Sequence, residues 1–88
     1  MTYGERAKKL KQRINQLESS DTLLDMSKIP AARLHPLKGN RDNEWAVDIL
    51  KNWRICFEIG NNPIPKSGDS VDLSKVSQIH IISIEDYH

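Results

Sequence analysis

The sequence predicts an α+β domain in which two N-terminal helices pack on one face of an antiparallel sheet of about four strands. Two observations predict this fold class. Apolar residues recur at spacings of three and four near the N-terminus, whereas they alternate with polar residues in the middle of the chain. Helices that precede a run of strands typically cover one face of the sheet, so we expect polar side chains on the other face.

The first helix is expected over residues 4–19. Its apolar stripe consists of Ala7, Leu10, Ile14 and Leu17. The residues that point away from this stripe are Lys8, Lys9, Lys11, Gln12 and Arg13. The basic surface that they help to form is either solvated or in contact with RNA or an acidic partner.

A second, short helix is expected next, with Ser20 or Asp21 as its N-cap. Pro30 should end it, because the residue before a proline is pushed away from helical backbone angles. Its apolar side would consist of Leu23, Leu24, Met26 and Ile29.

The following segments predict strands. Residues 33–37 are a short extended piece containing Pro36, which lacks a backbone donor and therefore belongs at a sheet edge. A turn over residues 39–43 then leads to a strand over residues 44–50. One face of that strand consists of Trp45, Val47 and Ile49.

Residues 53–59, after a tight connection at residues 51–52, form the clearest strand of the sequence. Trp53, Ile55, Phe57 and Ile59 alternate there with Arg54, Cys56 and Glu58. If the aromatic face meets the helices, Arg54 lies on the open face. Residues 60–75 are expected to be a long loop, either functional or mobile, and residues 76–84 the last strand.

Composition indicates one domain spanning residues 1–88 in a reduced, cytoplasmic setting. The 28% of charged residues and the lack of a ~20-residue apolar run argue against a membrane protein. The charged start does not look like a secretion signal, and Cys56, the single cysteine, cannot form an internal disulfide. The net charge is only +1, but most basic residues precede position 55, which weakly favours an RNA-binding surface.

Three separated segments carry residues suited to acid–base chemistry. His35 lies near Lys38, Arg54 lies in the middle of a strand, and the chain ends with Asp86, Tyr87 and His88. Histidine titrates near neutral pH, and arginine can bind a phosphate through two parallel hydrogen bonds. If the fold brings these segments together, the set suits metal-free cleavage of a phosphodiester. Each of these residues, considered alone, is more simply explained as a structural or solvent-exposed residue than as a catalytic one.

Other kinds of site are less well supported. The histidines and the cysteine are too scattered to predict a metal site. Cys56 is better explained as a small core residue than as a nucleophile, and Trp45 and Trp53 as core residues rather than stacking platforms for bases.

Three motifs, in this order, resemble the HigB-type toxins of the RelE superfamily, from about Gly4 to the last residue: Arg33-Leu34-His35-Pro36-Leu37-Lys38-Gly39, Asn52-Trp53-Arg54 and Asp86-Tyr87-His88. The resemblance implies a RelE-like fold and a ribosome-dependent endoribonuclease that cuts mRNA in the decoding site without a cofactor. It implies a HigA-like helix-turn-helix antitoxin as partner in a hetero-oligomer. The implied catalytic residues are His35, Lys38, Arg54, Asp86, Tyr87 and His88. RNA contacts would come from Lys38, Arg41, Arg54, Lys8 and Lys11.

The start of the chain departs from the family pattern. Members usually begin with a first strand and the start of the first helix, whereas this chain begins where that helix is under way. The loop at residues 60–75 is also longer than in compact members. These departures leave an alternative open, in which a catalytically impaired homologue binds antitoxin as a regulatory module.

Overall fold

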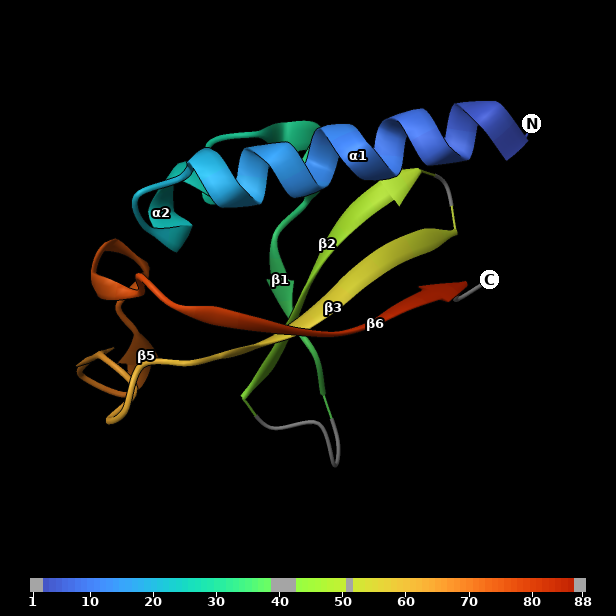
Figure 1. The fold of residues 1–88 in the computed structure, drawn as a ribbon. Coiled ribbons are helices and arrows are strands. Elements are labelled where there is room, and N and C mark those ends of the chain that lie inside the picture. The colour runs from blue at the N-terminus through green and yellow to red at the C-terminus, as the bar shows by residue number, and fades with distance from the viewer. Residues whose placement is uncertain (1–2, 39–42, 51, 87–88) are drawn as a thin grey trace.

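The structure is a computed structural model that describes residues 3–38, 43–50 and 52–86. Its first layer is the helix α1 (Tyr3–Ser19), which lies across one face of a sheet (Figure 1). It is followed by α2 (Leu23–Ser27), which has only five residues, and by the 3₁₀ turn η1 (Pro30–Ala32). The helical layer therefore consists of one long helix and short turns, so the prediction of two helices is met only in part.

The second helix begins later and ends earlier than predicted. Its N-cap is Thr22, which makes no side-chain capping bond. Ser20 instead donates its hydroxyl to the Gln16 carbonyl, 2.7 Å away, and so closes α1. Ser20 therefore satisfies the end of the first helix, whereas the Asp21 amide donates to Asp25 Oδ2 of α2 at 3.0 Å. Leu24, expected on the apolar side, is exposed.

The second layer is a four-stranded antiparallel sheet in the order β1-β2-β3-β6. Its strands are β1 (His35–Pro36), β2 (Glu44–Leu50), β3 (Trp53–Ile59) and β6 (Ile79–Asp86). The predicted strands at residues 44–50 and 53–59 and the edge position of Pro36 are confirmed. Asn52 links β2 to β3 at a φ of 71°, a left-handed conformation that asparagine tolerates better than most residues.

The last strand starts three residues later than predicted and continues two residues further. Val76, its expected first residue, is buried, and its carbonyl accepts a hydrogen bond from the Leu23 amide. The Val76 amide in turn donates to the Leu73 carbonyl. These bonds tie Val76 to the neighbouring helical turns, so its backbone is not available to the sheet.

Residues 60–75 are not the simple loop that the sequence suggested. They contain a two-stranded ladder of β4 (Lys66–Ser67) and β5 (Ser70–Val71), and a 3₁₀ turn, η2 (Leu73–Lys75). Asp72 caps that turn, because its carboxylate accepts hydrogen bonds from the Ser74 amide at 3.1 Å and the Ser74 hydroxyl at 2.6 Å.

The core lies between the sheet and the helical layer. The largest buried side chains include Phe57, Ile55 and Val47 from the sheet and Met26 from α2. Half-buried residues of α1 pack against them: Leu10, Ile14 and Leu17. Trp45 and Trp53 are half-buried and pack at the edge of this core, as predicted. Within the described residues, no helix is long and apolar enough to cross a membrane.

One buried charge attaches α1 to the sheet. The prediction that Arg13 points away from the apolar stripe is wrong, because Arg13 is only 6% exposed and its Nε donates to the backbone carbonyl of Asp48 at 2.7 Å. Its Nη1 donates to Gln16 on the same helix at 2.6 Å. A charged donor to a backbone carbonyl is stronger than a neutral one, so this contact fixes the helix over β2.

Candidate active site on the open face of the sheet

The face of the sheet that points away from α1, called the open face below, carries two rows of side chains. Residues directly opposite each other in antiparallel strands share a face, so the strand register defines both rows. Ile55 and Phe57 point into the core, and the residues that alternate with them therefore belong to the open face. The first row is Asp48, Arg54 and Glu85. The second row is His35, Ala46, Cys56 and Ser83.

Arg54 forms an ion pair with Glu85, in which Nη2 donates to Oε1 at 3.2 Å. The side chain of Arg54 is 16% exposed and that of Glu85 is 29% exposed, so both charges are largely shielded from water. The predicted position of Arg54 on the open face is confirmed by the register with Asp48 and Glu85.

A second ion pair continues the first row toward the edge of the sheet. Arg33, which precedes β1, donates its Nε to Asp48 Oδ2 at 2.6 Å and its Nη2 to Oδ1 at 3.3 Å. Charges therefore alternate across the sheet. In order they are Arg33, Asp48, Arg54 and Glu85.

Cys56 lies in the second row and is fully buried, although it points toward the open face. Burial raises the pKa of its thiol, and the negative charge of Glu85 and a hydrogen bond with that carboxylate raise it further. Ser83 donates its hydroxyl to Glu85 Oε2 at 2.6 Å. The thiol is therefore a protonated, buried group, which fits the prediction that Cys56 is not a nucleophile.

His35 is half-buried in the edge strand β1. Its Nδ1 lies 2.6 Å from the carbonyl oxygen of Arg33. A carbonyl oxygen can only accept, so Nδ1 carries the proton in this contact. In the neutral ring, Nε2 then holds the lone pair and is the nitrogen able to accept a proton.

The structure brings His35 and Arg54 to the same face, in adjacent rows with β2 between their strands. Neighbouring strands lie about 4.8 Å apart, so the backbones of β1 and β3 are roughly 10 Å apart. This spacing lets two long side chains reach a group between them. Lys38 is exposed just after β1, and the end of β6 lies beside the start of β3 (Figure 1).

Other predicted residues lie elsewhere. Asp86 is opposite Trp53, so strand alternation places it on the face opposite to that of Arg54. Lys8 and Lys11 are exposed on α1, in the other layer. Arg41, Tyr87 and His88 lie outside the described residues, and so does the predicted approach of His88 to His35.

The sequence pattern did not predict the two carboxylates beside Arg54, those of Asp48 and Glu85. Ser83 and Glu85 alternate with Ile82 and Ile84, which is the signal that could have placed them on one face. The residues of β3 that lie opposite Ser83 and Glu85 could not be deduced from the sequence, because an irregularity shifts the register of the pairing between Cys56 and Phe57. Among the described residues, no three His, Cys, Asp or Glu side chains form a group that could hold a metal ion.

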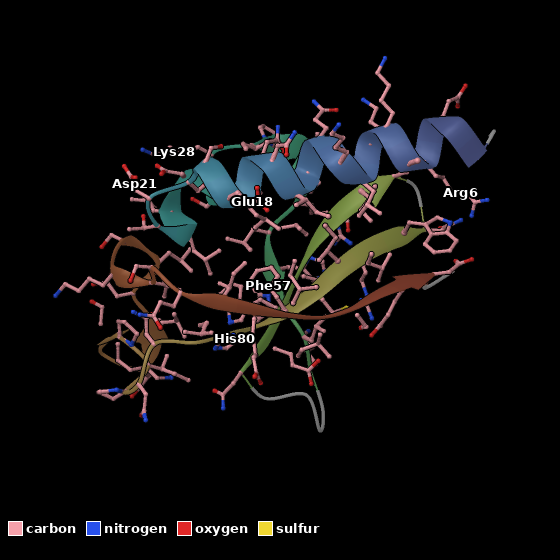
Figure 2. All side chains as sticks on the ribbon, in the orientation of Figure 1. Arg6, Glu18, Asp21, Lys28, Phe57 and His80 are labelled. Carbon is pink, nitrogen blue, oxygen red and sulfur yellow. The ribbon has the colours of Figure 1, made fainter. Side chains whose placement is uncertain are left out.

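Two of the grooves formed by the described residues do not reach Arg54. One, of about 190 Å³, is apolar and lies between α1 and the ends of β3 and β6, where the guanidinium of Arg6 sits 5.1 Å above the Trp53 ring (Figure 2). The other, of about 460 Å³, is more polar and lies between the start of β2 and the β4–β5 ladder, with Trp45 and Lys66 in its wall. Neither groove contains Arg54 among its described lining residues.

Comparison with known proteins identifies the family of this chain. The sequence model of a family described as the RelE-like toxin of the type II toxin–antitoxin system HigB matches residues 3–68. Endoribonuclease HigB of Proteus vulgaris is 34% identical to this chain over 79 residues, covering 86% of this chain and 70% of that protein. The chain therefore belongs to the HigB family of RelE-like toxins of type II toxin–antitoxin systems.

Proposed function

We propose that this toxin is an endoribonuclease that cleaves mRNA held in the ribosomal decoding site. The observation that carries the proposal is the open face, where His35 and a partly buried Arg54 share one surface with a row of alternating charges. A histidine can transfer a proton, and an arginine can neutralise a phosphate. The name of the Proteus vulgaris relative supports the same reaction class.

The proposed reaction is an attack by the 2′-hydroxyl of a ribose on the adjacent phosphorus. The bond from the 2′-oxygen to phosphorus forms as the bond to the 5′-oxygen breaks. A base takes the 2′-proton, and an acid gives a proton to the departing 5′-oxygen. The products are a 2′,3′-cyclic phosphate and a 5′-hydroxyl, and the transfer needs no metal ion.

The acid and base are proposed to be His35 and His88, with the order left open. Lys38 and Arg54 would hold the scissile phosphate and offset its developing charge. Asp86 lies on the face opposite to that of Arg54, so it would have to act from beside the end of β6 rather than from the open face, where it would orient an imidazole or accept a proton. Tyr87 would stack on a base or donate to a phosphate oxygen.

The ribosome is proposed to supply the orientation that so small a toxin lacks. An RNA strand must be held in an extended, reactive shape before the 2′-oxygen can attack in line. A codon in the decoding site is already held by the ribosome. Equal cleavage rates for naked and ribosome-bound mRNA would contradict this part of the proposal.

The cognate partner is proposed to be a HigA-like helix-turn-helix antitoxin that forms a hetero-oligomer with the toxin in the cytoplasm. Membership in a toxin–antitoxin family supports the existence of an antitoxin. Co-purification of the toxin with the product of the adjacent gene tests the pairing.

Cleavage by wild type and by a His88→Ala variant tests the function. Induced wild-type toxin should arrest bacterial growth and fragment mRNA, and the antitoxin should reverse both. His88→Ala should lower the cleavage rate by about 10²- to 10⁴-fold while still binding antitoxin. His80→Ala, which changes an exposed histidine in β6, is the matched control and should retain activity. A wild-type protein that binds antitoxin but leaves mRNA intact would identify a regulatory module instead.

A further inference from the structure

We infer that Glu85 is a positioning residue that holds the guanidinium of Arg54 in the orientation needed to bind the scissile phosphate. This inference rests on the proposed function and adds a residue to it. Glu85 lies directly opposite Arg54 in the sheet and accepts a hydrogen bond from its Nη2 at 3.2 Å.

The carboxylate of Glu85 is itself fixed at both oxygens. Oε1 accepts from Arg54, and Oε2 accepts from the Ser83 hydroxyl at 2.6 Å. Ser83 and Glu85 lie two residues apart on the same strand, so this bond forms within one face of β6. A carboxylate held from two sides cannot rotate without losing one of its bonds.

On the other side of Arg54, a second carboxylate is also held by a hydrogen-bonding partner. Asp48 faces Arg54 from β2, and two hydrogen bonds from Arg33 hold its carboxylate. Arg54 therefore stands in register between two carboxylates, each with an anchoring partner of its own. Its Nε is also shielded from solvent. The guanidinium plane is set before any substrate arrives.

The carboxylates beside Arg54 orient its guanidinium but do not increase the affinity of the protein for RNA. A carboxylate beside Arg54 repels an incoming phosphate, so Glu85 should not strengthen RNA binding. A planar guanidinium, however, binds a phosphate through two parallel hydrogen bonds only when its plane is aligned with the phosphate oxygens. The contribution of Glu85 should thus be seen in the rate of the chemical step.

Glu85→Gln separates these two effects, because glutamine has the shape of glutamate but offers one acceptor oxygen in place of two for Arg54 and Ser83, and no negative charge. We expect kcat on programmed ribosomes to fall about 10- to 100-fold, as for a small displacement of a catalytic group. The KM should be unchanged or lower, since a repulsive charge has been removed. Glu85→Asp restores the charge and should recover part of the rate.

Glu58→Gln is the matched control. Glu58 is also a carboxylate on the open face, but it is exposed and pairs in register with Glu44 and His80 rather than with Arg54. It should leave kcat unchanged. Equal kcat for Glu85→Gln and wild type would overturn the inference, and so would a fall in activity that only follows a loss of folded protein.

A measurement independent of cleavage keeps this test separate from that of the proposed function. The NMR signal of the Arg54 guanidinium should report restricted motion in wild type and in Glu58→Gln, and freer motion in Glu85→Gln. An identical signal in all three would refute positioning by Glu85. If the wild type cuts no mRNA, the proposed function and the catalytic role of Glu85 both fall, while the signal still decides whether Glu85 restrains Arg54.

Discussion

At the scale of single residues, Arg54 shows what the sequence could reveal about the candidate site. Its place between apolar residues of a strand predicted that it points away from the core, and the structure confirms this. Its partner could not be predicted, because Glu85 lies 31 residues away and the pairing contains a bulge. Alternation identifies the face of a side chain, whereas its neighbours depend on the register.

Replacing Arg54 with lysine tests whether the shape of the cation matters as well as its charge. Lysine keeps the positive charge beside Glu85 but cannot donate two parallel hydrogen bonds to a phosphate. We expect the rate of mRNA cleavage to fall by about 100-fold, the effect of losing one preorganised donor. Single-turnover cleavage measures the rate, and thermal unfolding checks that the variant is folded. Wild-type cleavage by a folded Arg54→Lys protein would contradict a two-pronged phosphate contact.

At the scale of elements, periodicity located the two central strands but not the small ones. The strands at residues 44–50 and 53–59 are long enough for alternation to be seen, and their bounds agree with the structure. The strands of the β4–β5 ladder have two residues each, which is too short for a period of two to appear. The strand β6 begins later than predicted because the backbone of Val76 is hydrogen-bonded to the neighbouring helical turns.

Asp72 allows a prediction about pH at the N-cap of η2. Hydrogen bonding from Ser74 lowers the pKa of the Asp72 carboxyl. A carboxyl whose pKa is lower in the folded state stabilises the fold fully above its unfolded pKa of ~3.9. The stabilisation is lost as the pH falls through the depressed folded-state value.

Asp72→Ala should therefore lower the midpoint of thermal unfolding at neutral pH. The difference from wild type should shrink as the pH falls through the acid range, because protonation removes the same contribution from wild type. Thermal unfolding at several pH values measures both effects. Asp69→Ala, an exposed aspartate in the same segment, is the control. A constant difference at all pH values would show that the charge of Asp72 does not act through this cap.

At the scale of the whole molecule, the two layers separate surfaces that the sequence alone had grouped together. Lys8 and Lys11 were expected to contact the same RNA as Arg54, but α1 covers the face opposite to the open face (Figure 1). A phosphate held at Arg54 is therefore remote from these lysines. They can still contribute a long-range attraction to a large, negatively charged partner.

Neutralising both lysines, as Lys8→Gln with Lys11→Gln, should affect association and not chemistry. The value of kcat/KM on ribosomes should fall at low salt, and the loss should diminish at higher salt as the charges are screened. The single-turnover rate at saturating ribosome should stay at the wild-type value. A lower saturating rate would show that α1 contacts the RNA being cut. The neutral control is Gln12→Ala on the same helix.

The burial of Cys56 has a practical consequence. This cysteine is the only one in the chain, and it is enclosed in the third strand of the sheet with its thiol protonated. Because Cys56 points toward the open face, an alkylating reagent can reach the sulfur only in molecules whose neighbouring side chains on that face have moved aside. The rate of alkylation therefore measures how often the cover over Cys56 opens, in the native chain and without an added label.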